Sequence, residues 1–151
     1  MKIVFVPASS LDFRTLAAKL DAYYFELVGA IQHRYAEPTR PENMTALAVA
    51  YEDGVPVACG AWKRLDETKA ELKRLYVLPE FRRRGVASAL IAALEADAAA
   101  AGIRRVILET AVETTDSHRL YLSAGYLPMD YYGSPAGEAN CLCFCKDTNP
   151  A

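Results

Sequence analysis

The feature that most constrains the fold is a long apolar helix between two strands near the middle of the chain. Strand-like runs occupy residues 70–78 and 105–110, and Gly102 stands where a left-handed cap would close the helix. A strand, a helix and a strand in this order form a right-handed crossover, so the two strands are expected to run parallel. The residues that share the apolar face of this helix are Ala87, Leu90, Ile91, Leu94, Ala98 and Ala101.

The N-terminal part of the chain predicts a strand followed by a helix. Residues 1–6 alternate like a short strand, and Ser9 with Asp12 offers a capping pair for the helix. The periodicity then fails over residues 33–43, which are expected to form a loop on the substrate side. The leucines at helical spacing in this helix are Leu16, Leu20 and Leu27.

An antiparallel meander should follow this loop. Residues 44–51 and 55–63 are strand-like, and the Asp-Gly pair between them is a strong signal for a tight turn. Pro56 lacks a backbone donor, so the second strand is expected to begin at an edge or a bulge. Residues 70–78 would add the third strand of the meander.

The C-terminal part predicts one more helix and two more strands. A short helix is expected over residues 116–124, closed by Gly125, and strands over residues 126–131 and 140–146. No repeat or second-domain boundary interrupts this pattern. Residues 1–151 are therefore expected to form a single domain.

The composition argues against a nucleic-acid, membrane or secreted protein. Seventeen basic and nineteen acidic side chains nearly cancel, so no overall charge favours nucleic acid or an anionic membrane. No apolar run reaches the ~20 residues that span a bilayer, and the N-terminus lacks the regions of a secretory signal. We expect a cytoplasmic protein, and 151 residues with 52% apolar content suffice for one core.

The cysteine spacing suits neither a zinc site nor a redox pair. Cys141, Cys143 and Cys145 alternate along the last expected strand, so all three would face one way, while Cys59 stands apart. Free cysteine behaves as a small apolar residue, so burial in the sheet is the expected role and no metal is expected. A ligand or redox role is the weaker alternative.

The residues that lead into the long helix carry the clearest functional signal. Arg82-Arg83-Arg84-Gly85 follows a strand and opens directly into the helix. A helix N-terminus leaves its first backbone N–H groups unpaired and attracts anions, and Gly85 lets a phosphate approach the main chain. The three arginines add forked donors. The GxxxxGK[ST] and GxGxxG patterns are absent, so the anion is not expected to be that of ATP or NAD.

Arg82-x-x-Gly85-x-Ala87 matches the R/Q-x-x-G-x-G/A signature of the GNAT (GCN5-related N-acetyltransferase) superfamily, with the alanine that the pattern permits. The chain resembles small bacterial-type GNAT acetyltransferases closely from Glu71 to Tyr126. This resemblance implies the α/β (α+β) GNAT fold. That fold is a mixed central sheet of about six to seven strands with a splay between the fourth and fifth, flanked by about four helices.

The resemblance also implies acetyl-CoA as co-substrate and an enzyme that acetylates a primary amine of a small molecule, an amino-acid derivative or a peptide. Main-chain groups of Leu75, Tyr76 and Val77 would meet the pantetheine arm in the splay. The pyrophosphate would lie on the arginine loop and the first helical turn. The expected binding residues there are Arg82, Arg83, Arg84, Gly85, Val86, Ala87 and Ser88.

The same resemblance supplies two catalytic candidates. Tyr121 falls where the family often keeps a tyrosine that protonates the departing CoA thiolate; an aromatic packing role is the alternative. Glu71 aligns with a catalytic glutamate of some protein-acetylating relatives. On a strand Glu71 shares a face with Lys73, so an ordinary ion pair is an equal alternative. In that case a water relay would take the amine proton.

Acceptor recognition is expected from the loops that flank the splay. His33, Arg34 and Tyr35 precede the first hairpin, Tyr132 lies in the last loop, and His118 precedes Tyr121 by one helical turn. Packing or solvent exposure is the competing interpretation for each of them.

Two other functions fit the same residues. One is a protein lysine or N-terminal acetyltransferase, and the other is a non-catalytic acyl-CoA sensor that keeps the fold and the phosphate loop. GNAT relatives are often homodimers, but the sequence leaves the oligomeric state open, as it does the identity of the acceptor.

Overall fold

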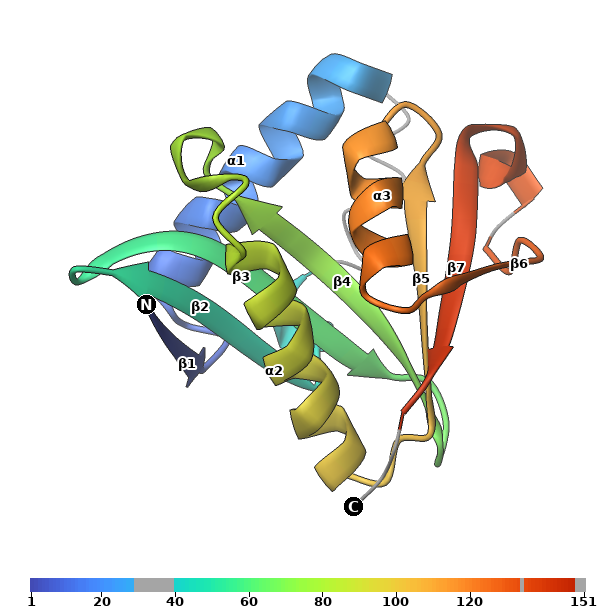
Figure 1. The fold of residues 1–151 in the computed structure, drawn as a ribbon, viewed down its shortest axis with the longest axis horizontal. Coiled ribbons are helices and arrows are strands. Elements are labelled where there is room, and N and C mark those ends of the chain that lie inside the picture. The colour runs from blue at the N-terminus through green and yellow to red at the C-terminus, as the bar shows by residue number, and fades with distance from the viewer. Residues whose placement is uncertain (29–39, 134, 149–151) are drawn as a thin grey trace.

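One seven-stranded sheet organises the computed structural model, which describes residues 1–28, 40–133 and 135–148 (Figure 1). Its spatial order is β1-β2-β3-β4-β5-β7-β6. The strands are β1 (Lys2–Val6), β2 (Ala46–Glu52), β3 (Val55–Arg64), β4 (Lys69–Val77), β5 (Arg105–Ala111), β6 (Leu127–Met129) and β7 (Cys141–Asp147). The helices are α1 (Leu11–Val28), α2 (Val86–Ala100) and α3 (Thr115–Ser123), with short 3-10 turns at Pro41–Asn43, Pro79–Phe81 and Pro135–Asn140.

The sheet opens between its two parallel strands. β4 and β5 pair at Lys69–Arg105, Ala70–Val106 and Glu71–Ile107, whereas every other neighbouring pair is antiparallel. Beyond Glu71, β4 has no strand partner on its β5 side among the described residues. The expected splay between the fourth and fifth strands is therefore confirmed.

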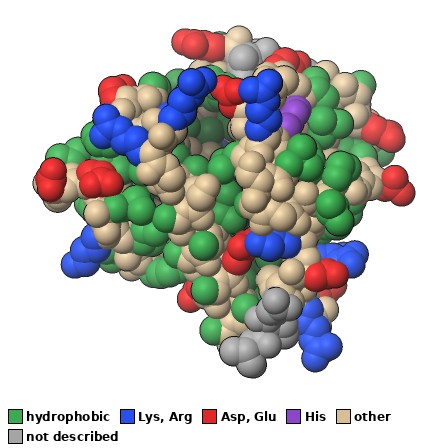
Figure 2. Space-filling view, in the orientation of Figure 1, with side chains coloured by type: hydrophobic (Ala, Val, Ile, Leu, Met, Phe, Trp, Pro, Cys, Tyr) green, Lys and Arg blue, Asp and Glu red, His purple; other side chains and the backbone are tan. Residues whose placement is uncertain are grey.

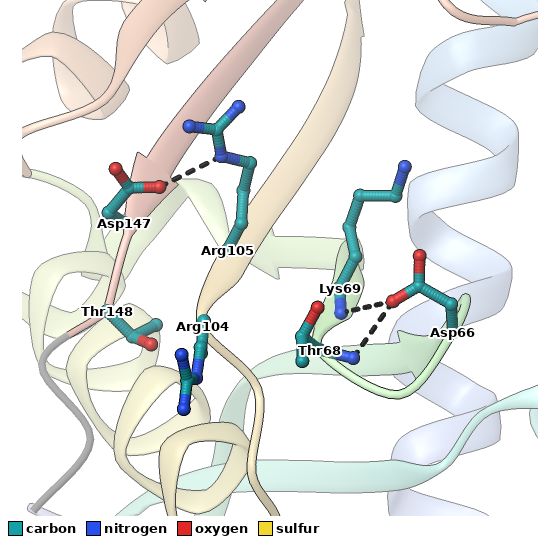
Figure 3. A pocket seen from close by; sticks show the side chains of 7 residues that line it. All are labelled: Asp66, Thr68, Lys69, Arg104, Arg105, Asp147 and Thr148. Carbon is teal, nitrogen blue, oxygen red and sulfur yellow. Dashed lines mark hydrogen bonds and ion pairs between the residues drawn. The ribbon is translucent and has the colours of Figure 1, made fainter.

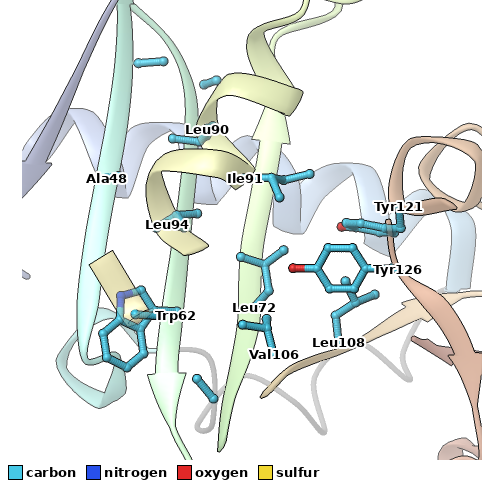
Figure 4. Close-up of a cluster of buried hydrophobic side chains, with 14 of the residues drawn as sticks. Ala48, Trp62, Leu72, Leu90, Ile91, Leu94, Val106, Leu108, Tyr121 and Tyr126 are labelled. Atoms are coloured by element: carbon cyan, nitrogen blue, oxygen red, sulfur yellow. The ribbon is translucent and has the colours of Figure 1, made fainter. Parts of the chain in front are cut away.

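Helices cover both faces of the sheet. Alternate strand residues such as Ala48, Ala58 and Leu72 pack with α2 and Tyr126 in the larger core (Figure 4). On the other face, Phe13 and Leu16 of α1 pack in the smaller core with Leu47, Val49, Cys59 and Ala61. This alternation is the two-residue period of a strand, with both of its faces buried.

Local signals place most of the elements, with small corrections. Gly102 and Gly125 have φ of +91° and +94° and close α2 and α3 as expected. Ser10 caps α1 in place of Ser9, because its Oγ accepts the Phe13 N–H at 3.2 Å. The described residues hold three α-helices, one fewer than the four or so expected.

Two strand irregularities have clear causes. The β2–β3 register shifts at Tyr51 opposite Pro56, the bulge expected from a residue without a donor. Strand β6, in the last hairpin, is shorter than the strand expected over residues 126–131. β6 covers Leu127–Met129 and contains Pro128, which an edge strand tolerates because β6 pairs only with β7.

Among the described residues, no helix has the length and apolar character to cross a membrane.

Candidate functional site

The N-terminus of α2 is open. Gly85 is its N-cap with φ of +80°, and no side chain caps the helix. A Cβ at Gly85 would have no atom of another described residue within 4 Å, so these residues leave the space beside the turn open. The first-turn N–H groups of Val86, Ala87 and Ser88 lack intrahelical partners by the geometry of a helix. These donors and the helix dipole make an anion site.

The three arginines beside this helix end are exposed. Arg82 is anchored, because its Nε donates to the Val77 carbonyl at 3.0 Å and its guanidinium lies 5.6 Å from the centre of the Tyr76 ring. Arg84 lies 5.3 Å from the centre of the Phe81 ring. None of the three is ion-paired with a described acidic residue, so their charges remain available to an anion.

A bulge in β4 shapes the edge of the splay. Arg74 has φ of +61°, and the β3–β4 register shifts beside it. Its side chain turns to α1, where it reaches Asp21 at 2.9 Å and the Ala17 carbonyl at 3.0 Å. The following residues, Leu75–Val77, continue β4 and have no strand on their β5 side in the part of the chain that the structure describes. Their backbone edge is therefore open to an extended ligand.

A hollow separates the arginine loop from α3. Figure 2 shows it near the top of the molecule, with basic side chains on either side and a histidine at its edge. In the described part of the chain this histidine is His118. The hollow lies over the region where β4 and β5 separate in Figure 1. The splay, the helix end and α3 thus border one opening.

Tyr121 lies on α3, one helical turn after His118, on the side of the helix that packs into the larger core. It is buried against Tyr126 and Phe144, at ring-centroid distances of 5.9 and 6.1 Å. Burial raises the pKa of its hydroxyl, and the Tyr24 hydroxyl of α1 raises it further. Tyr121 therefore stays protonated near neutral pH, as a proton donor must.

His118 is held at the end of β5. Its Nε2 lies 2.9 Å from the Ala111 carbonyl, which assigns the proton to that nitrogen because a carbonyl can only accept. Thr114 reaches the same carbonyl at 2.7 Å and lies 2.8 Å from Thr110. These contacts fix the turn between β5 and α3.

Glu71 is buried on the face of the sheet that carries α1. It pairs with Lys73 at 3.1 Å, as the shared strand face predicts. Its second oxygen accepts the Tyr132 hydroxyl at 2.5 Å. Burial, and then the neighbouring Glu71, raise the pKa of Tyr132, so the tyrosine is the donor. The last loop thus closes over the candidate base.

Tyr24, Thr110 and Glu109 lie near these side chains and were not among the sequence-based candidates. Tyr24 adjoins Thr110 and Tyr121, and Glu109 adjoins Tyr132. Glu109 could have been suspected as a carboxylate in an otherwise apolar strand, whereas no local pattern pointed to Tyr24. The candidates His33, Arg34 and Tyr35 lie outside the described residues.

A second hollow lies at the opposite end of β4 and β5 (Figure 3). Its polar groups largely satisfy one another: Asp66 Oδ1 accepts the Thr68 and Lys69 N–H groups, and Arg105 pairs with Asp147 at 2.9 Å. The Arg104 and Arg105 N–H groups also donate to the Thr68 carbonyl, which joins this turn to the start of β5. We therefore assign this hollow a structural role. Among the described residues, no group of three His, Cys, Asp or Glu is placed to hold a metal ion.

A mixed sheet that opens between two parallel strands, with helices on both faces, is the architecture of the GNAT fold. Residues 13–126 match the family model described as Acetyltransferase (GNAT) family. The chain belongs to the GNAT family.

Individual relatives agree with this assignment. The uncharacterized N-acetyltransferase YedL of Escherichia coli K12 is 33% identical over 94 residues, which are 58% of this chain and 59% of YedL. A Klebsiella pneumoniae protein assigned as an acyl-CoA N-acyltransferase superposes with a TM-score of 0.82 at 24% identity, covering 98% and 97% of the two chains. The PaiA N-acetyltransferase of Thermoplasma acidophilum, solved with coenzyme A, gives 0.73 at 18% identity, covering 97% and 99%. The two solved structures support the fold alone.

Proposed function

We propose that this protein transfers the acetyl group of acetyl-CoA to a primary amine of a small molecule, an amino-acid derivative or a peptide. The observation that carries the proposal is the open N-terminus of α2 at Gly85, next to three arginines that form no ion pair with a described residue and to the part of β4 that has no described strand on its β5 side. This arrangement offers backbone donors and positive charge to a pyrophosphate and an unpaired strand edge to an amide-containing arm.

The chain's own residues divide the proton work. Acetyl-CoA supplies the acetyl group as a thioester. Tyr121, which is buried on α3 and protonated, gives its proton to the departing CoA thiolate, which leaves as the free thiol. Glu71, or a water relay in its place, takes the proton that the amine loses. Tyr132 and Lys73 hold the Glu71 carboxylate in place, one on each oxygen.

The deciding experiment follows CoA release with a thiol reagent across amines, polyamines, amino acids, antibiotics and peptides, beside a blank without enzyme. Burial raises the pKa of Cys59 and, together with Glu109, that of Cys141 to about 12, so these two thiols should react slowly with the reagent. We expect amine-dependent release and micromolar or tighter acetyl-CoA binding by calorimetry. Failure to bind acetyl-CoA would refute the proposal. Tight binding with no release would favour a protein acceptor or an acyl-CoA sensor instead.

A further inference from the structure

A group of acidic side chains lies on the α1 side of the splay, beyond the residues already assigned to acetyl transfer. In the β5–β7 register Glu109 stands opposite Cys143. Glu109 also adjoins the Cys141 thiol and Tyr132, whose hydroxyl donates to Glu71. We call Glu71, Glu109, Tyr132, Cys141 and Cys143 the carboxylate cluster.

The two carboxylates of this cluster differ in their partners. Both oxygens of Glu71 are engaged, one by Lys73 and one by Tyr132, and Lys73 balances its charge. Glu109 has no such balance: no described Lys, Arg or His pairs with it. The neighbouring thiols and Tyr132 are uncharged acids, which cannot neutralise it. Within residues 1–28, 40–133 and 135–148, the carboxylate cluster therefore holds one carboxylate, that of Glu109, without a cationic partner.

One oxygen of Glu109 is also without a hydrogen bond. Its Oε1 is shielded from solvent and accepts no hydrogen bond from the described residues. The last loop packs closely here, since a Cβ at Gly133 would lie 3.0 Å from Glu109 Oε2. A buried carboxylate oxygen without a donor is unfavourable, so the site favours a cationic donor from outside the chain. Glu109, Tyr132 and Cys141 are each partly exposed, which gives the carboxylate cluster a route to the surface.

The carboxylate cluster lies beside the candidate base of the proposed reaction. Glu71 is the register partner of Ile107 across the parallel β4–β5 pair, and Ile107 and Glu109 are two residues apart on β5. Because alternate strand residues point to the same face, Glu71 and Glu109 share one face of the sheet. Tyr132 lies between them, since its hydroxyl donates to Glu71 and Glu109 adjoins it. A short flexible acceptor can thus hold its reacting nitrogen near Glu71 and a second group at Glu109.

We propose that Glu109 selects the acceptor, and that the acceptor is a small amine with a second cationic group whose ammonium lies against Glu109. This inference rests on the proposed function for the position of the reacting nitrogen. The second cationic group is inferred from Glu109 itself, which has neither a described cationic partner nor a hydrogen-bond donor at its Oε1. Glu71 remains the candidate for the amine proton, and Glu109 recognises the substrate without taking part in the transfer.

The kinetic test compares diaminobutane with butylamine and aminobutanol, together with a series of longer linear diamines. For the wild-type enzyme, kcat/KM for diaminobutane should exceed that for butylamine by about tenfold or more, which corresponds to ~1.4 kcal/mol. Glu109→Gln should remove this preference through KM, leaving kcat and the butylamine rate nearly unchanged. Glu67→Gln makes the same charge change on an exposed turn and should keep the preference.

A binding test separates this inference from the proposed function. Diaminobutane is titrated by calorimetry into the CoA-loaded wild-type protein and into Glu109→Gln, with thermal unfolding to show that the variant is folded. If the wild type binds diaminobutane and Glu109→Gln does not, the result supports this inference, whether or not acetyl transfer is observed. The absence of acetyl transfer would overturn the proposed function alone. Turnover of neutral amines or peptides with no diamine preference overturns this inference alone. An unchanged diamine preference in folded Glu109→Gln, or no diamine binding by the wild type, also overturns it.

Discussion

At the scale of single residues, the proposed chemistry depends most on the hydroxyl of Tyr121. Its ring packs against Tyr126 and Phe144, so Tyr121→Phe removes the hydroxyl and keeps the packing. Because that hydroxyl is the proposed proton donor, kcat should fall by about a hundredfold or more, the usual size of a general-acid contribution. Acetyl-CoA affinity should change little, since the bound thioester needs no proton.

Single-turnover kinetics and calorimetry of Tyr121→Phe measure these two quantities separately. Tyr126→Phe is the control, because it removes the hydroxyl of another tyrosine in the same core. That hydroxyl donates to Glu95 on α2 and has no proposed role in proton transfer. This control variant should leave kcat near the wild-type value. A wild-type kcat in Tyr121→Phe would return Tyr121 to a packing role.

At the scale of elements, the N-terminus of α2 should decide acetyl-CoA binding. Gly85→Glu places bulk and negative charge where the pyrophosphate is proposed to lie, so the dissociation constant for acetyl-CoA should rise at least about tenfold, or ~1.4 kcal/mol. The helix itself should survive, because a carboxylate at a helix N-terminus is favourable to the dipole. The positive φ of +80° makes any side chain here strained, by roughly 1–2 kcal/mol.

Gly54 offers a matched control for that strain. Its φ is +79°, and a Cβ there, as at Gly85, would meet no atom within 4 Å, but it lies in the β2–β3 turn. Gly54→Glu should therefore lose similar stability in thermal unfolding while acetyl-CoA binding, measured by calorimetry, stays at the wild-type value. Equal affinities for Gly85→Glu and Gly54→Glu would refute the phosphate-loop assignment.

At the scale of the whole molecule, local sequence signals predicted the elements better than their contacts. The Asp-Gly turn, Gly85 and Gly102 each mark a position of positive φ, which a local pattern can show. The ion pair of Glu71 with Lys73 follows from strand spacing. The Tyr132 hydrogen bond to Glu71 joins residues 61 positions apart, and β7 inserts between β5 and β6. Such pairings depend on how the sheet assembles, so no local pattern shows them.

The splay poses a stability question for the whole molecule, because β4 and β5 share only three residue pairs. A polar network joins the two parts of the sheet through α2: Tyr126 donates to Glu95 at 2.8 Å, and Lys146 reaches the same carboxylate at 3.0 Å. Tyr126 is fully buried and the Glu95 side chain is only 14% exposed. Tyr126→Phe should therefore lower the free energy of unfolding by about 1–3 kcal/mol, the usual cost of a buried acceptor left without its donor.

Urea denaturation followed by the fluorescence of Trp62, the only tryptophan, and by circular dichroism measures this loss. Trp62 reports on β3, so coincident transitions in the wild type would show that the two parts of the sheet unfold together. Tyr51→Phe is the matched control, since it also removes a hydrogen bond from a tyrosine to a carboxylate, here Asp12 at 2.6 Å. This bond lies nearer the surface and does not cross the splay. Tyr51→Phe should lower the free energy of unfolding by less than about 1 kcal/mol. Equal losses for Tyr51→Phe and Tyr126→Phe would mean that the Glu95 network does not hold the splayed sheet together, and that the shared core around α2 does so alone.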